Sequence, residues 1–194
     1  MNKLFEKINT QVTILGSLIA ILWILQIINS ELLAGTLNNY GGIHPQSSIG
    51  FTLIRSIFLA PFLHGSYAHL MANIPPLIIL GWLIMLRGFD DFFFVSIVTI
   101  IVSGLGIWCV GAPNSVHIGA SGLIFGYFGF LLLRSLFDFS VLSVIFALTA
   151  GFLYSGLIWG ILPSDPNISW EAHLFGFLGG IFAAQLLGKR KKNT

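Results

Sequence analysis

Charged residues are the main shortage in this chain of 194 residues: aspartate, glutamate, lysine and arginine together make up 8% of it. A soluble domain carries roughly a quarter charged residues, so this composition excludes an ordinary water-soluble fold. Cysteine occurs once, at Cys109, which excludes an intrachain disulfide framework. We expect this side chain to be a small, buried apolar group. Apolar residues are abundant, at 56%, with a mean hydropathy of +0.92, so an integral membrane protein is expected.

Six apolar stretches have about the length that a membrane crossing requires. Roughly 20 helical residues cross ~30 Å of hydrocarbon. Because lipid offers no hydrogen-bond partners, backbone groups must be satisfied within each segment, so the stretches are expected to be helices. The sequence therefore predicts an all-α membrane protein, a six-transmembrane-helix bundle formed by one domain over residues 1–194. The expected spans are 11–30, 66–86, 92–110, 119–135, 139–160 and 170–187.

Lysine and arginine orient this bundle. With the N-terminus inside, eight of the nine basic residues fall on the inner side and only Arg55 falls outside. Cytoplasmic loops carry an excess of basic residues, so the N- and C-termini are predicted to be cytoplasmic. The segment 31–62 then becomes a long outer loop, of a length that is usually functional or partly embedded. The inner basic residues are Lys3, Lys7, Arg87, Arg134, Lys189, Arg190, Lys191 and Lys192.

Polar residues capable of chemistry lie at the outer ends of three spans. Polar groups at membrane depth are functional-site hypotheses by default. At 1.5 Å per helical residue, three of them lie about 20–24 Å from the basic residue that ends their own span, so they share one depth. The candidates are His64, His69, Asn73, Ser121 and His173.

Glycines allow two of these spans to approach closely. Gly122-x-x-x-Gly126 follows Ser121, and Gly176-x-x-x-Gly180 follows His173. Small residues four apart let transmembrane backbones come into contact. We therefore expect the fourth and sixth spans to pack together and to bring the serine and the histidine within reach of each other.

A serine beside a histidine points to acyl transfer. Serine needs a base to remove its proton, and a neutral histidine is the usual one. Glu171 lies on another helix face from His173, so a Ser121–His173 dyad is favoured over a triad. The N–H of Ser121 at a helix start, with His69 and Asn73 four residues apart, would stabilise an oxyanion. His64 is better placed to order the loop or a water molecule.

Each residue also has a structural explanation. The run around Ser121 could serve only helix packing, His69 and Asn73 could be interhelical hydrogen-bond partners, and His173 could be a buried, satisfied histidine. Convergence of His64, His69 and His173 on a metal is disfavoured, because their spacing lacks the i, i+4 pair of helical zinc sites. His44 and His117 are expected to be solvated in outer loops.

Three motifs together resemble the rhomboid family of intramembrane serine proteases, in its basic six-helix bacterial form. They are His64-Gly-Ser-Tyr-Ala-His69-Leu-Met-Ala-Asn73, Gly119-Ala-Ser-Gly122 and Ser169-Trp-Glu-Ala-His173-Leu-Phe-Gly176. They occur in the family's order and on the corresponding helices, and the resemblance spans nearly the whole chain.

The resemblance implies a role for each matching residue. Ser121 would be the nucleophile and His173 the general base, with His69 and Asn73 assisting the Ser121 amide in the oxyanion hole. His64 would be an accessory histidine, and Gly119 would help to shape the hole. The activity implied is cleavage of transmembrane-protein substrates near the outer membrane face. The implied partners are these substrates and membrane lipids, with no nucleic acid, no metal and no cofactor, in a bacterial inner membrane.

The chain departs from the family pattern at Ala172, where many members have glycine, and in three further places. Phe125 stands where some relatives have tyrosine, so we expect its ring to stack under His173 without contributing a hydroxyl. Ile54-Arg55 replaces the frequent Trp-Arg pair of the first outer loop. Pro75 and Pro76 follow Asn73 and are expected to kink the second span, which bears on the oxyanion role of Asn73.

Two other classes of function remain as alternatives. A non-catalytic rhomboid-like protein that binds transmembrane clients typically lacks the serine or the base, and this chain has both. A small transporter or channel is disfavoured by the lack of an internal repeat and of paired carboxylates within the spans.

Overall fold

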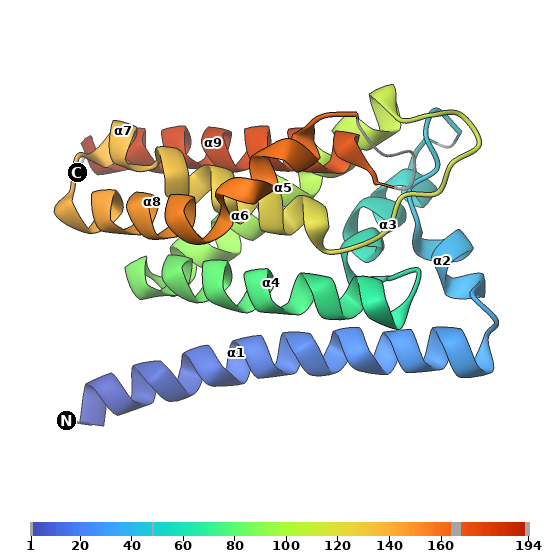
Figure 1. Cartoon of the computed structure of the whole chain (residues 1–194), viewed down its shortest axis with the longest axis horizontal. Helices are drawn as coiled ribbons and strands as arrows, with labels where there is room; N and C mark the ends of the chain where they lie inside the picture. Colours follow the sequence, from blue (N-terminus) through green and yellow to red (C-terminus); the bar gives the residue numbers. More distant parts are fainter. Residues whose placement is uncertain (1, 48, 164–167, 193–194) are drawn as a thin grey trace.

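The computed structural model describes residues 2–47, 49–163 and 168–192. The regular elements of these residues are helices, with one isolated β-bridge between Ile43 and His117. The long helices run side by side along one axis (Figure 1). The start of α1 and the end of α9 lie at the same end of this bundle. The all-α prediction is confirmed.

Within the described residues, five helices are long and apolar enough to cross a membrane. Two of them change helix type near one end: the π-helix η1 (Ile28–Leu32) extends α1, and the 3-10 helix η3 (Ser155–Ile161) extends α8. The helices are α1 (Asn2–Ile27), α4 (Tyr67–Arg87), α5 (Phe89–Val110), α8 (Val141–Tyr154) and α9 (Trp170–Lys192). They correspond to five of the six predicted spans.

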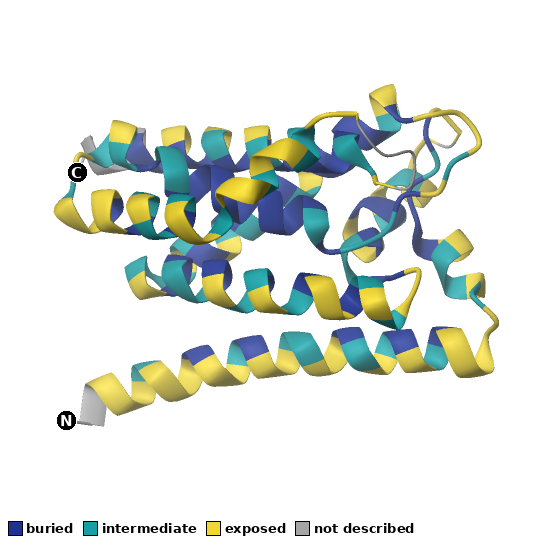
Figure 2. Ribbon diagram, viewed as in Figure 1, coloured by how far each residue is buried: buried dark blue, intermediate teal, exposed yellow. Residues whose placement is uncertain are grey.

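The remaining predicted span, 119–135, corresponds to the short helix α6 (Ser121–Leu133), with 13 residues. It rises only about 20 Å, less than the ~30 Å of a hydrocarbon core. Nearly all of its residues are buried by the surrounding helices, whereas α1 and α8 keep broad exposed faces (Figure 2). Helix α6 is therefore enclosed by the other helices over most of its length.

Several boundaries differ from the sequence prediction. The first helix begins at Asn2 rather than near residue 11. The long segment 31–62 contains ordered helices: α2 (Thr36–Gly41), α3 (Phe51–Leu59) and the 3-10 helix η2 (Ala60–Phe62). Helix α4 continues through Pro75 and Pro76 as a single α-helix. The prediction for Cys109 was wrong, because its side chain is exposed near the end of α5.

The predicted glycine contact between α6 and α9 is confirmed. A methyl group at Gly176 would overlap the carbonyl of Gly122, and one at Gly180 would overlap the carbonyl of Gly126. Backbone atoms cannot move aside as a flexible side chain can, so only glycine permits this approach. The same contact holds the start of α6 beside the start of α9.

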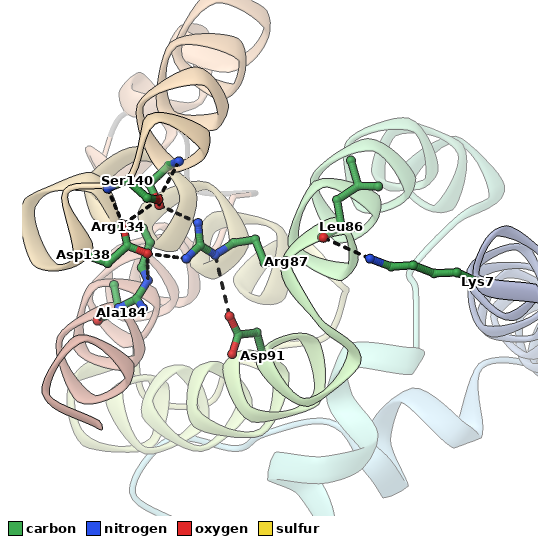
Figure 3. Close-up of polar contacts among 9 residues, drawn as sticks. Lys7, Leu86, Arg87, Asp91, Arg134, Asp138, Ser140 and Ala184 are labelled. Carbon is green, nitrogen blue, oxygen red and sulfur yellow. Dashed lines mark hydrogen bonds and ion pairs between the residues drawn. The ribbon is translucent and has the colours of Figure 1, made fainter. Parts of the chain in front are cut away.

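At the end of the bundle that holds the termini, a cluster of charged side chains ties the helices together (Figure 3). Asp138, the last residue of the short helix α7 (Ser135–Asp138), forms ion pairs with Arg87 of α4 and with Arg134, the latter at 3.3 Å. Arg134 Nη1 also donates to the carbonyl of Ala184 in α9, at 2.6 Å. The three charged side chains are at most 5% exposed, so each depends on its partners for solvation.

Candidate active site

Helices α4, α6 and α9 begin at the opposite end of the bundle (Figure 1). A cavity of about 980 Å³ lies there. Its lining comes from α4, the loop between α5 and α6, α6 itself, η3 and α9. Four of the residues singled out in the sequence line this one cavity: His69, Asn73, Ser121 and His173. Since a water molecule occupies about 30 Å³ in the liquid, the space is large enough to hold both water and a peptide segment.

Ser121 is the first residue of α6 and is half-buried. The first N–H groups of an α-helix have no partner inside the helix, and they lie at the positive end of its dipole. The N–H of Ser121 is such a group. An oxygen atom that gains negative charge beside Ser121 would therefore find a donor in the backbone.

His173 lies in the first turn of α9 and is 9% exposed. Its ring stacks on Phe125, one helical turn beyond Ser121 in α6, with centroids 4.0 Å apart and planes 5° apart. The expected stacking contact is confirmed. It fixes the plane of the imidazole at the level where α6 begins.

A backbone carbonyl fixes the tautomer of His173. The ring atom Nδ1 lies 2.8 Å from the carbonyl oxygen of Gly160 in η3. A carbonyl oxygen only accepts hydrogen bonds, so Nδ1 carries the proton and Nε2 keeps a free lone pair. In serine hydrolases a carboxylate often orients the catalytic histidine. The Nδ1 partner of His173 is a backbone carbonyl instead. Sequence reasoning missed Gly160, because nothing in the chain marks a carbonyl contact made by a 3-10 helix.

The hydroxyl of Ser121 and the imidazole of His173 are not joined by a hydrogen bond in the part of the chain that the structure describes. They line the same cavity from adjoining helices. In free enzymes such bonds are often long, and they tighten when substrate binds.

Asn73 and His69 line the cavity, and both side chains can donate hydrogen bonds. Asn73 is 7% exposed, and its Nδ2 has no hydrogen-bond partner among the described residues. A buried donor without a partner is costly, and an oxyanion would satisfy it. A Cβ atom at Gly119 would stand 2.8 Å from the His69 ring, and φ at Gly119 is +120°. Glycine at this position therefore leaves room for the ring and permits the turn before α6.

His64 lies behind the cavity rather than in its lining. It is 1% exposed, its ring meets that of His69 edge-on at 5.0 Å, and Nε2 accepts the N–H of Ala120 at 3.4 Å. Burial, with a smaller effect of nearby His69, lowers its pKa to about 4 against an opposing hydrogen bond with the backbone of Phe62. The ring is neutral at pH 7, and it supports the turn that leads into Ser121.

The prediction that His117 is solvated was wrong. It is 8% exposed and hydrogen-bonds to Ser115 and to Ser169. His44 is half-buried, and its Nε2 lies 2.9 Å from the carbonyl of Asn39.

Arg55, beside Ile54 in α3, stacks its guanidinium 3.8 Å from the centre of the Tyr40 ring.

Glu171 lines the cavity and is buried, but no described hydrogen bond joins it to His173. Among the described residues, no group of three or more His, Cys, Asp or Glu side chains is arranged to hold a metal ion.

Comparison with known proteins identifies relatives across most of the chain. The Rhomboid domain family matches residues 51–190. An uncharacterized protein of Mycobacterium tuberculosis is 36% identical over 190 residues, which cover 94% of this chain and 77% of the relative. A Bacillus subtilis protein, whose name assigns it provisionally to the rhomboid proteases, is 29% identical over 133 residues, 67% of this chain and 65% of its own. RHOMBOID-like protein 5 of Arabidopsis thaliana is 29% identical over 144 residues, 65% of this chain and 41% of its own.

Proposed function

The chain belongs to the rhomboid family, and from this we propose that it is an intramembrane serine endopeptidase acting through Ser121 and His173. One observation carries the proposal. A serine at a helix start, a histidine whose Nε2 is free to accept a proton, and an unpaired buried amide donor all line one cavity.

In the proposed first step, the Oγ atom of Ser121 attacks the carbonyl carbon of the scissile peptide bond. The Oγ proton passes to Nε2 of His173, and the carbonyl π electrons move onto the oxygen atom. His173 then gives the proton to the leaving amine as the C–N bond breaks, which leaves an acyl-enzyme on Ser121. Water repeats the sequence and releases the acid. The hydrogen bond from Nδ1 to Gly160 steadies the imidazolium at each stage.

The oxyanion formed in each step needs donors that are already in position. We assign this role to the N–H of Ser121, the Nδ2 group of Asn73 and the ring of His69. Donors fixed before the reaction cost no reorganisation when charge develops, so they lower the barrier more than water would. His64 and Gly119 would act behind them, by holding the turn before α6.

We further propose that residues 1–194 form one membrane domain with six spans and with cytoplasmic N- and C-termini. The short helix α6 is the fourth span. In this orientation the cavity opens toward the outer face, and Arg87, Arg134 and Asp138 lie at the inner face. Bacterial relatives support an inner-membrane location. The substrates would be transmembrane proteins, cut where their helices reach the depth of Ser121.

A fluorophosphonate probe tests the proposal on the purified protein. The probe forms a covalent bond with a serine only when that serine is activated by a base. We expect labelling of the unaltered chain and none of Ser121→Ala or His173→Ala. Equal labelling of Ser121→Ala would reject the assignment, and no labelling of the folded, unaltered chain would favour a client-binding relative without catalysis.

A further inference from the structure

A second polar cluster connects the segments that lead into Ser121 and His173. The ring of His117, in the loop between α5 and α6, lies between two serine hydroxyls. Its Nδ1 is 2.6 Å from Oγ of Ser169, and its Nε2 is 2.7 Å from Oγ of Ser115. Ser115 belongs to the same loop, but Ser169 immediately precedes α9. The contact with Ser169 therefore spans two segments that lie 52 residues apart in the chain.

Only one assignment of donors and acceptors fits all the hydrogen bonds of this cluster. Oγ of Ser169 accepts the N–H of Ala172, at 3.4 Å, and so caps the start of α9. Ser115 donates its own proton to the carbonyl of Ala112, at 2.6 Å. Oγ of Ser115 must then accept from Nε2–H of His117, which leaves Nδ1 to accept the proton of Ser169.

The cluster is therefore built for a neutral histidine. In the Nε2–H tautomer every donor named above has an acceptor, whereas a proton on Nδ1 would face the Ser169 hydroxyl as a second donor. Burial lowers the pKa of His117, and this effect exceeds the opposing effect of the nearby Glu171 carboxylate. The ring is neutral at pH 7, and the chain of hydrogen bonds is complete.

The two ends of the contact are placed alike relative to the proposed dyad. His117 comes four residues before Ser121, and Ser169 comes four residues before His173. The backbone of His117 is also restrained, because its N–H and carbonyl both form hydrogen bonds with the backbone of Ile43. A shift between the loop and the start of α9 would change the separation of the serine and the histidine.

We propose that His117 is a positioning residue, whose hydrogen bond to Ser169 sets the distance between Ser121 and His173. This inference rests on the proposed function, since it concerns the geometry of the same dyad. His117 lines the cavity, but both of its ring nitrogens are hydrogen-bonded within the cluster, so we assign it no proton exchange with substrate. It acts on the chemical step through the register of the two segments, and a misplacement of about 1 Å can cost up to about 100-fold in rate.

A double-mutant cycle tests the proposal on the purified full chain in detergent. We would measure kcat and KM for a transmembrane substrate in His117→Phe, Ser169→Ala and the double variant, with thermal unfolding to establish that each is folded. Each single change should lower kcat by about 10- to 100-fold and alter KM by less than about 2-fold. The double variant should be no slower than the slower single variant, because all three lose the same bond.

Two further variants separate positioning from helix capping. Ser169→Thr keeps both a hydroxyl and an N-cap, so its kcat should return to within about 3-fold of the unaltered chain. Ser140→Ala removes an equivalent cap from α8 at the far end of the bundle, and it should leave kcat unchanged. Should His117→Phe fail to fold, the comparison of Ser169→Ala with Ser169→Thr still decides.

The outcomes distinguish this inference from the proposed function. An active unaltered chain whose His117→Phe variant keeps full kcat would overturn the positioning role alone. So would losses that multiply in the double variant, or a Ser169→Thr variant as slow as Ser169→Ala. An unaltered, folded chain that neither cleaves substrate nor reacts with fluorophosphonate would overturn both.

Discussion

The imidazole of His173 lies flat against the ring of Phe125, with 4.0 Å between centroids and 5° between planes. This contact joins α9 to α6 one helical turn from Ser121. Together with the hydrogen bond to Gly160, it leaves the ring little freedom to tilt or flip. The proposed base is therefore oriented by an aromatic face and a carbonyl rather than by a carboxylate.

Replacing Phe125 should slow the chemical step. Phe125→Ala removes the surface on which His173 rests, and we expect kcat to fall by about 10- to 100-fold with little change in KM. Phe125→Tyr keeps the ring and serves as the matched control, with kcat within about 3-fold of the unaltered chain. Steady-state cleavage of a transmembrane substrate provides the measurement. Equal kcat in Phe125→Ala would show that the stack does not orient the base.

Asn73 is predicted to act in the transition state. Asn73→Ala should lower turnover by about 10- to 1,000-fold, because it removes one donor to the oxyanion. The change should also leave the fold intact, since Nδ2 of Asn73 makes no hydrogen bond among the described residues. Turnover and thermal unfolding would be measured on the same preparation. An unchanged rate would return Asn73 to a structural role.

The charge cluster around Asp138 is predicted to stabilise the fold rather than to act in catalysis. Asp138→Asn removes the counter-charge of buried Arg134 and leaves Arg87 paired with Asp91 alone, at 3.6 Å. Breaking a buried pair costs about 3–5 kcal/mol. We expect a lower unfolding temperature in detergent and near-normal kcat for the folded fraction. Asp90→Asn, which alters an exposed carboxylate nearby, is the control. Equal unfolding temperatures for the two variants would contradict this assignment.

His64 should make stability depend on pH. Its pKa is about 4 in the folded protein against a usual value of 6.5, so the folded state holds the ring neutral. The stabilisation is fully present above pH 6.5 and is lost as the pH falls from 6.5 through 4, by about 3 kcal/mol in total. Unfolding measured across this range should show a steeper loss for the unaltered chain than for His64→Gln. Parallel curves would exclude a buried neutral His64 as the cause.

The sequence was sufficient to predict the parts of the fold and site that depend on side-chain type and spacing. The contact of α6 with α9 was predicted from four glycines, because only glycine allows backbones to approach so closely. They are Gly122, Gly126, Gly176 and Gly180. The resemblance to the rhomboid family predicted the stacking of Phe125 on His173. Hydropathy located the helices within a few residues, apart from the start of α1.

The features that the sequence did not predict depend on backbone geometry or on contacts between distant segments. The carbonyl of Gly160 reaches His173 because α8 ends in a 3-10 helix, and no side chain marks that change. His117 looked like a loop histidine, because its partner Ser169 is far away in sequence. Cys109 was placed in the interior from its apolar character, yet the side of α5 that it occupies is exposed.

The central claim is that Ser121 and His173 cut peptide bonds, and its most direct measurement is proteolysis by the purified protein in lipid vesicles. A single-pass transmembrane protein would be the substrate, with fragments identified by mass. We predict cleavage near the outer end of the substrate helix by the unaltered chain and by Ser47→Ala, which alters an exposed serine. Ser121→Ala and His173→Ala should give no fragments while unfolding at the normal temperature. Undiminished cleavage by Ser121→Ala would contradict the account.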